Sequence, residues 1–190
     1  LRKDFIVEHG WAYGYDALVK FEKGRYYFWG VYAWSKVQRD DGIQVYAPNF
    51  VRRHNVNLVA NVKMGKEERW FLSVRWNLGT GFPFTPTQGY YPGIDFLDPF
   101  GNPDINFDYT TANGDPSVLY GALNGNGLPT YHRLDASLKY STTLKTGQAE
   151  VVIGATNIYD RENIFYYDRV AAERVNQLPI MPTISASFTF

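Results

Sequence analysis

Residues 53–65 read RHNVNLVANVKMG, and apolar and polar side chains alternate along them. Because successive side chains of a β-strand point to opposite faces of a sheet, this stretch predicts a strand with one apolar and one polar face. The apolar face carries Val56, Leu58, Ala60, Val62 and Met64. The polar face carries Asn55, Asn57, Asn61 and Lys63.

The same period of two recurs on both sides of this stretch and predicts about seven strands in all. The other strands are expected at 11–22, 25–38, 69–78, 133–141, 148–159 and 182–190. Each is close to the roughly 9–11 residues that a tilted strand needs to cross a bilayer. The pattern therefore predicts an all-β fold.

The connections between these strands alternate between short and long. Tight turns are predicted at Lys23-Gly24-Arg25, Gly65-Lys66-Glu67 and Lys145-Thr146-Gly147. Longer polar loops are predicted at 39–50, 80–130 and 160–182. Up-and-down antiparallel order would place all the short turns on one side and all the long loops on the other, as in transmembrane β-barrels.

Alternation alone does not distinguish a soluble sandwich, whose apolar face points inward, from a membrane barrel, whose apolar face meets lipid. Two features favour the barrel. The apolar faces carry large aromatic side chains near both strand ends, namely Trp11, Trp34, Trp76 and Tyr131 beside long loops and Tyr26, Trp70, Tyr140 and Phe190 beside short turns. The polar faces carry ionic groups, namely Asp16, Lys20, Glu22, Arg69, Arg75, Arg133, Asp135, Lys139 and Glu150.

Composition excludes several other classes of protein. The 190 residues have a formal net charge of zero, which gives no electrostatic reason to expect a nucleic acid partner. Cysteine is absent, which excludes disulfides, thiolate zinc sites and cysteine nucleophiles. The longest strongly apolar stretch, YYFWGVYAW, is far shorter than the about 18–20 residues of a membrane helix. The opening LRKDFIVEHG lacks the apolar region of a signal peptide, so we expect any export signal upstream of it.

An ordered set of motifs occupies the last third of the chain. LPTYHRLDASLKYS holds Arg133 and Asp135, GATNIYDRENIFYYD holds Asn157-Ile158-Tyr159-Asp160, and QLPIMPTISASFTF holds Leu178, Pro179, Pro182 and Phe190. This set resembles the C-terminal end of TonB-dependent outer-membrane receptors. Upstream, WAYGYDALVKFEKG, VRRHNVNLVANVKMG and LGTGFPFTPTQG resemble successive strand and loop motifs of the same family. The resemblance covers nearly the whole chain.

The resemblance implies a barrel of about 22 strands around a plug. Residues 1–190 would form the C-terminal part of that barrel, without the plug and the earlier strands. The implied function is TonB-dependent uptake of a scarce nutrient, such as siderophore-bound iron, a vitamin, an oligosaccharide or a peptide, across the outer membrane of a Gram-negative bacterium. The implied partners are the lipid bilayer, the rest of the same receptor, the TonB complex through the plug, and a surface lipoprotein.

Two groups of aromatic residues are candidates for function. Exposed rings in the long loop are candidate substrate contacts, namely Tyr90, Tyr91, Phe96, Phe100 and Tyr109. The alternative is that these rings pack the loop against itself. Phe188 and Phe190 resemble the family's membrane-insertion signal, and they also fit a band of interfacial aromatic residues.

Motifs for catalysis, cofactors or metals are not found. His9, His54 and His132 lack the spacing of paired metal ligands, and neither Gly-x-Ser-x-Gly nor His-Glu-x-x-His occurs. Oxygen ligands for calcium would be available between Asp98 and Asp108, but their spacing departs from the EF-hand pattern. We therefore expect no enzyme activity and no cofactor. The first alternative to a transporter is a complete small outer-membrane barrel with a structural or adhesion role. The second is a barrel enzyme such as a lipase or protease, but no Ser-His or Asp-His arrangement for a nucleophile and its base stands out in the sequence.

Overall fold

The computed structural model describes residues 8–93, 116–169, 171 and 173–190. These residues form antiparallel β-sheets, so the prediction of an all-β fold is confirmed. The described ranges contain no helix with the length and apolarity that crossing a membrane requires.

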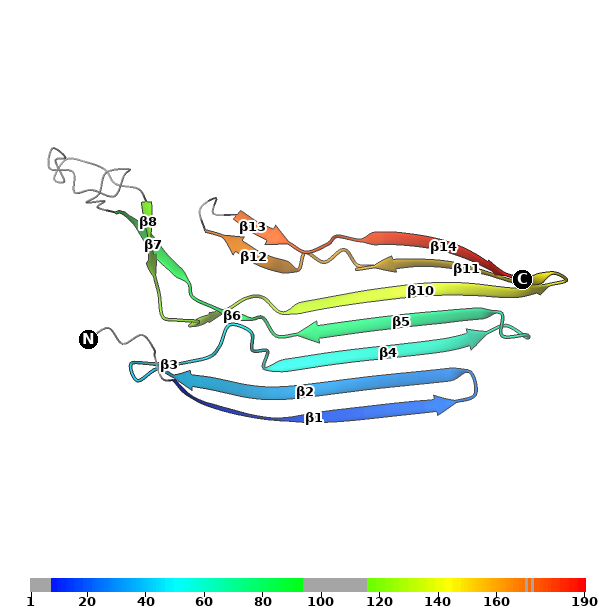
Figure 1. The fold of residues 1–190 in the computed structure, drawn as a ribbon, viewed down its shortest axis with the longest axis horizontal. Helices are drawn as coiled ribbons and strands as arrows, with labels where there is room; N and C mark the ends of the chain where they lie inside the picture. The colour runs from blue at the N-terminus through cyan, green and yellow to red at the C-terminus, as the bar shows by residue number, and fades with distance from the viewer. Residues whose placement is uncertain (1–7, 94–115, 170, 172) are drawn as a thin grey trace.

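Seven long strands lie side by side in sequence order and form the main sheet (Figure 1). They are β1 (His9–Lys23), β2 (Tyr26–Asp40), β4 (His54–Met64), β5 (Trp70–Gly79), β10 (Tyr131–Leu144), β11 (Gly147–Thr156) and β14 (Met181–Thr189). The two-residue strand β3 (Val45–Tyr46) pairs with the end of β2. The number and order of the strands agree with the period-two pattern, although several strands extend beyond the predicted bounds.

The short turns all lie at one end of this sheet and the long connections at the other (Figure 1). Gly24 and Gly65 lie in two of the short turns with φ angles of +57° and +87°. Glycine adopts this left-handed conformation without the steric cost that a Cβ atom would add. The short turns and the long connections thus lie at opposite ends of the sheet, as the sequence predicts.

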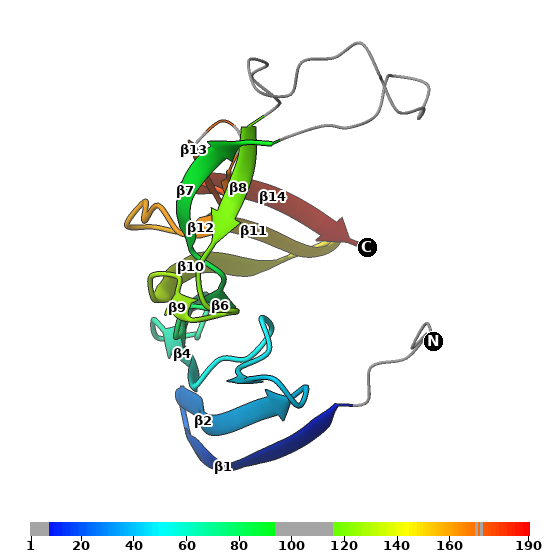
Figure 2. The same ribbon diagram turned by 90° about the vertical axis from the view of Figure 1, so that its left-hand side faces the viewer.

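The main sheet is open and curved. Figure 2 shows it nearly end on, as an arc that runs from β1 to β14. In the part of the chain that the structure describes, β1 pairs only with β2 and β14 pairs only with β11. The seven strands therefore do not close into a barrel by themselves.

The strand register determines which side chains share a face, because directly paired residues point the same way. One row across all seven strands consists of Glu22, Tyr27, Asn61, Ser73, Ser137, Gly154 and Thr183. A neighbouring row on the opposite face consists of Phe21, Phe28, Ala60, Val74, Ala136, Ala155 and Pro182. The sheet thus has one largely polar and one apolar face over its whole width.

Nothing covers the apolar face among the described residues, and none of their hydrophobic side chains is buried. Ile153 is 58% exposed and Ile184 is 77% exposed, although both lie on this face. A soluble sandwich would bury such residues between two layers. The described chain forms a single layer instead.

Aromatic side chains gather at both ends of the apolar face, as predicted. At the turn end, the ring centroids of Trp70 and Tyr140 lie 4.7 Å apart. At the loop end, Trp34 stacks on Tyr15 with 5.5 Å between centroids. Tyr131 was expected in this second band, but that prediction is wrong. It pairs with Gly79 in the polar-face row, because it lies an odd number of residues from the apolar positions of its strand.

The long loops contain short strands that the sequence pattern did not indicate. Strand β6 (Pro83–Phe84) pairs with β9 (Asn126–Gly127), and β7 (Thr87–Pro92) pairs with β8 (Pro116–Tyr120). Strand β12 (Ile164–Asp168) pairs with β13 (Glu173–Asn176). The β7–β8 and β12–β13 hairpins project beyond the loop end of the main sheet (Figure 1).

Candidate functional site

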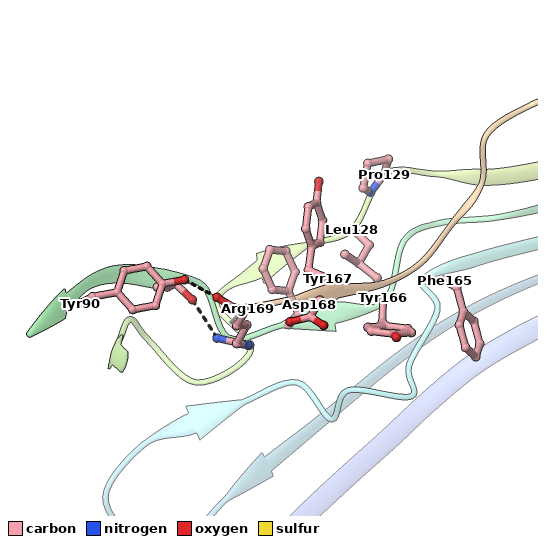
Figure 3. Close-up of a pocket in the computed structure, with 11 residues that line it drawn as sticks. Tyr90, Leu128, Pro129, Phe165, Tyr166, Tyr167, Asp168 and Arg169 are labelled. Carbon is pink, nitrogen blue, oxygen red and sulfur yellow. Dashed lines mark hydrogen bonds between the residues drawn. The ribbon is translucent and has the colours of Figure 1, made fainter. Parts of the chain in front are cut away.

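A cavity of about 530 Å³ lies between the two loop hairpins at the loop end of the sheet. Five aromatic residues line it, namely Phe84, Tyr90, Phe165, Tyr166 and Tyr167. Figure 3 shows residues from 165–169, on and just after β12, beside Leu128 and Pro129, with Tyr90 at the far end. Three separate stretches of the chain therefore build one site.

Arg169, just after β12, connects the β12–β13 hairpin to the segment that leads into β7 and to β7 itself through hydrogen bonds. Its Nη1 donates to Oγ1 of Thr87 over 3.1 Å, and its Nη2 donates to the backbone oxygen of Thr85 over 2.6 Å. The hydroxyl of Tyr90 donates to the backbone oxygen of Arg169 over 2.5 Å (Figure 3). The guanidinium also lies 5.1 Å from the ring centroid of Tyr120 in β8. Two of its nitrogens thus donate hydrogen bonds within the protein, and its positive charge lies near the ring of Tyr120.

The aromatic rings of the cavity contact each other but keep accessible surfaces. Phe84 and Tyr167 stack with 6.3 Å between centroids and 23° between planes, although they belong to different hairpin systems. Phe165 and Tyr166 meet edge to face at 5.5 Å. Phe165, Tyr166 and Tyr167 all remain exposed to solvent. This arrangement can accept a flat or ring-shaped molecule against an aromatic face.

The predicted substrate contacts meet this site only in part. Tyr90 lines the cavity, whereas Tyr91, the next residue of β7, does not. Phe96, Phe100 and Tyr109 lie outside the described residues, as does the stretch 98–108 considered for calcium. The sequence did not predict that residues 165–169 line this cavity. The aromatic stretch IFYYD at 164–168, in a loop between two predicted strands, could have indicated it.

A network of hydrogen bonds around Asn157 holds the base of the β12–β13 hairpin. Asn157 is fully buried. Its Nδ2 donates to the backbone oxygens of Arg161 (3.0 Å) and Leu178 (3.2 Å), and its Oδ1 accepts from the backbone nitrogen of Arg161 (3.1 Å). Its φ angle is +54°, a conformation that asparagine tolerates better than most residues.

Two aspartates extend this network to the neighbouring segments. Asp135 of β10 accepts from the backbone nitrogen of Asn157 over 3.0 Å, and Nη2 of Arg133 donates to its other carboxylate oxygen over 2.9 Å. Asp160 accepts from the backbone nitrogen of Ile180 over 2.7 Å. Residues of the Arg-x-Asp and Asn-Ile-Tyr-Asp motifs thus have a structural role. These residues fix the path of the chain between β11 and β14.

Arg52 makes a second set of contacts between separate segments near the loop end of the main sheet. Its guanidinium lies 4.2 Å from the ring centroid of Phe82 and 5.2 Å from that of Tyr131. Its Nε is buried without a hydrogen-bond partner among the described residues. This burial lowers the pKa of Arg52 from the usual arginine value, because desolvation disfavours the charged form. The contact ties the segment before β4 to the start of β10.

Two of the described histidines, His54 and His132, hydrogen-bond to tyrosines. Nδ1 of His54 lies 2.8 Å from the hydroxyl of Tyr32, and Nδ1 of His132 lies 2.7 Å from the hydroxyl of Tyr159. Within the described ranges, no three histidine, aspartate or glutamate side chains gather as a metal site would require. The cavity between the loop hairpins is therefore the strongest candidate for binding.

Gly81 lies against the backbone of Leu128, which is one of the residues that line this cavity. A Cβ atom at Gly81 would lie 1.6 Å from the backbone oxygen of Leu128. Gly81→Ala is therefore expected to push Leu128 away and to destabilise the loop region by about 1–3 kcal/mol, as overpacking does. Limited proteolysis of the folded protein would detect this as faster cleavage in the loops. Gly89→Ala is the matched control, because a Cβ at Gly89 would meet nothing within 4 Å.

The described chain thus combines a sheet that has two chemically different faces with an aromatic cavity among its long connections. Both features come from the chain's own geometry. Comparison of the sequence and fold with family models, with curated proteins and with solved structures finds no match.

Proposed function

We propose that the chain forms part of the barrel wall and outer loops of a TonB-dependent transporter, which takes up a scarce nutrient across the outer membrane of a Gram-negative bacterium. The observation that carries this proposal is the uncovered apolar face of a single curved sheet. Lipid hydrocarbon would cover that face without a second protein layer. The loop hairpins and their cavity would then lie on the outer side of the membrane.

The cost of leaving this face in water supports the membrane environment. Each Å² of apolar surface removed from water contributes about 25 cal/mol. The row from Phe21 to Pro182 is only one of several apolar rows on the face. A soluble antiparallel sheet normally covers such a face with a helix or a second sheet. The described residues provide neither.

The opposite face supports a hydrated or protein-filled interior. Lys139 pairs with Glu150 over 3.3 Å, and the hydroxyl of Ser141 donates to the same carboxylate oxygen over 3.0 Å. Ionic and hydroxyl groups of this kind suit a water-filled lumen or contact with a plug.

The open edges of the sheet support association with further strands. The outer backbone groups of β1 and β14 have no strand partner among the described residues. In hydrocarbon, each unsatisfied backbone group would cost several kcal/mol, which closed barrels avoid. In the proposed receptor, the remaining strands of the barrel pair with these edges, and a plug fills the interior against the polar face.

Localisation and energy dependence test this proposal together. The complete gene product is expected in the outer-membrane fraction as a band whose mobility on SDS gels changes on heating, as folded barrels show. Uptake of its nutrient should stop when TonB is absent. Recovery of the folded protein in the soluble fraction would contradict the membrane assignment. Outer-membrane localisation with full activity in the absence of TonB would favour a small structural or adhesion barrel.

The aromatic residues at the end of β14 give a second test. The ring centroids of Phe188 and Phe190 lie 6.2 Å apart, and both side chains are exposed. If they form the insertion signal, replacing Phe190 by serine should lower the amount of receptor in the outer membrane several-fold. Thr189→Ser is the control, because that residue points to the other face. Unchanged outer-membrane levels of the Phe190 variant would contradict a role in insertion.

A further inference from the structure

We propose that the cavity between the loop hairpins binds a neutral oligosaccharide, whose sugar rings stack on the exposed aromatic residues of 165–167. This inference rests on the proposed function, because it identifies the class of nutrient that the outer loops recognise. Three observations support it: the size of the cavity, its solvent-accessible aromatic rings, and the hydrogen bonds that its single arginine already makes within the protein.

The size of the cavity suits a molecule of a few rings. Its volume of about 530 Å³ falls within the range of roughly 300–1,000 Å³ that is typical of small-molecule sites. The lining comes from three segments that Arg169 and Tyr90 fasten together through hydrogen bonds. The binding surface is therefore held in place before a ligand arrives, which lowers the entropy cost of binding.

The aromatic lining matches the surface of a sugar ring. One face of a pyranose carries axial C–H groups, which pack against the electron-rich face of an aromatic ring. Phe165, Tyr166 and Tyr167 present exposed rings on consecutive residues of β12. Tyrosine adds a hydroxyl that can donate and accept hydrogen bonds, and sugar hydroxyl groups can do both.

The charged groups of the cavity disfavour an anionic ligand. Among the described residues that line it, Arg169 is the only cation, and it already donates to Thr85 and Thr87. Ferric catecholate chelates and phosphorylated ligands carry negative charge and are usually bound by arginine or lysine groups that are available to them. Asp168 adds a carboxylate to the lining, which would repel an anion, and its Oδ1 accepts from the backbone nitrogen of Ala171 over 3.0 Å.

Titration calorimetry on the complete gene product in detergent tests the inference. The probes are neutral oligosaccharides built from glucose, mannose, galactose or xylose, together with a uronic acid oligosaccharide and a ferric catecholate chelate. At least one neutral oligosaccharide is expected to bind, and the two anionic probes are not. Tyr167→Ala should weaken that binding by about tenfold, because it removes an aromatic stacking contact.

Two further variants separate stacking from a general effect on the loops. Tyr91→Ala removes an exposed ring from β7 that does not line the cavity, so it should leave the affinity unchanged. Tyr166→Phe keeps an aromatic face and removes only a hydroxyl, so it should retain more affinity than Tyr166→Ala. Equal losses in the Tyr91 and Tyr167 variants would overturn the assignment of the site.

The outcomes distinguish this inference from the proposed function. If the protein lies in the outer membrane and needs TonB but binds none of the neutral oligosaccharides, the inference is wrong and the transporter proposal stands. The same holds if the ferric chelate binds and Tyr167→Ala abolishes its binding. If the purified protein binds a sugar through Tyr167 but is found in the soluble fraction, the transporter proposal fails instead.

Discussion

Replacing Val74 by arginine is expected to destabilise the membrane-inserted protein by about 2–4 kcal/mol, the range for arginine on the lipid-facing side of a barrel near the bilayer midplane. Val74 lies in the central strand β5, and its register partners on the apolar face are Ala60 and Ala136. The aromatic bands at the two ends of this face place Val74 between them. An arginine there would have to leave water for hydrocarbon.

The neighbouring residue provides the matched control. Ser73 lies in the same strand but on the opposite face, where it pairs with Asn61 and Ser137. Ser73→Arg should destabilise the protein less than Val74→Arg does, because its charge stays on the polar face beside Asn61 and Ser137 and does not enter hydrocarbon. Urea unfolding of the complete protein in lipid vesicles would measure both variants.

The comparison distinguishes the two possible orientations of the sheet. If the apolar face instead packed on another protein layer, Val74→Arg would still be harmful, but the protein would be recovered without lipid or detergent. If the polar face were the one in contact with lipid, Ser73→Arg would be the damaging variant. A tolerated Val74→Arg would contradict the proposed membrane environment directly.

The main strands could be predicted from the sequence because their signal is local. In residues 53–65, each side chain's face follows from its position in the chain, and the neighbours Val56 and Asn57 already differ in polarity. The prediction for Tyr131 was wrong because an aromatic side chain near a loop does not determine the face on which it lies, which alternates with residue number along a strand. The register places Tyr131 beside Gly79 on the other face.

The loop cavity could not be predicted because its parts are remote in sequence. Phe84 lies in the connection from β5 to β10, and it contacts Tyr167 in the connection from β11 to β14. Arg169, also in the second connection, hydrogen-bonds to Thr85 and Thr87 in the first. Neither contact follows from a repeating pattern of apolar and polar residues in the sequence. Turn and loop composition indicated only that residues 80–130 and 160–182 leave the sheet. The pairing of β7 with β8 and of β12 with β13 depends on tertiary context that propensity does not supply.

Replacing Asn157 by aspartate is expected to have the second large effect, a local destabilisation of about 3–5 kcal/mol, because it leaves buried polar groups without partners. Aspartate retains an oxygen that can accept from the backbone nitrogen of Arg161. It loses both donations from Nδ2, to the backbone oxygens of Arg161 and Leu178, and places a carboxylate against them. The carboxylate of Asp135, which accepts from the backbone of this residue, adds like-charge repulsion.

Asn157→Gly separates the side-chain bonds from the backbone conformation. Glycine adopts a φ angle of +54° easily but makes none of the three side-chain hydrogen bonds, so it should be less harmful than aspartate. Asn176→Asp, at an exposed residue of β13, controls for the charge alone. Amide hydrogen exchange at Ile180, whose nitrogen donates to Asp160, would measure local opening. If the Asn157→Asp and Asn176→Asp variants exchange at the same rate, the buried asparagine does not hold this segment.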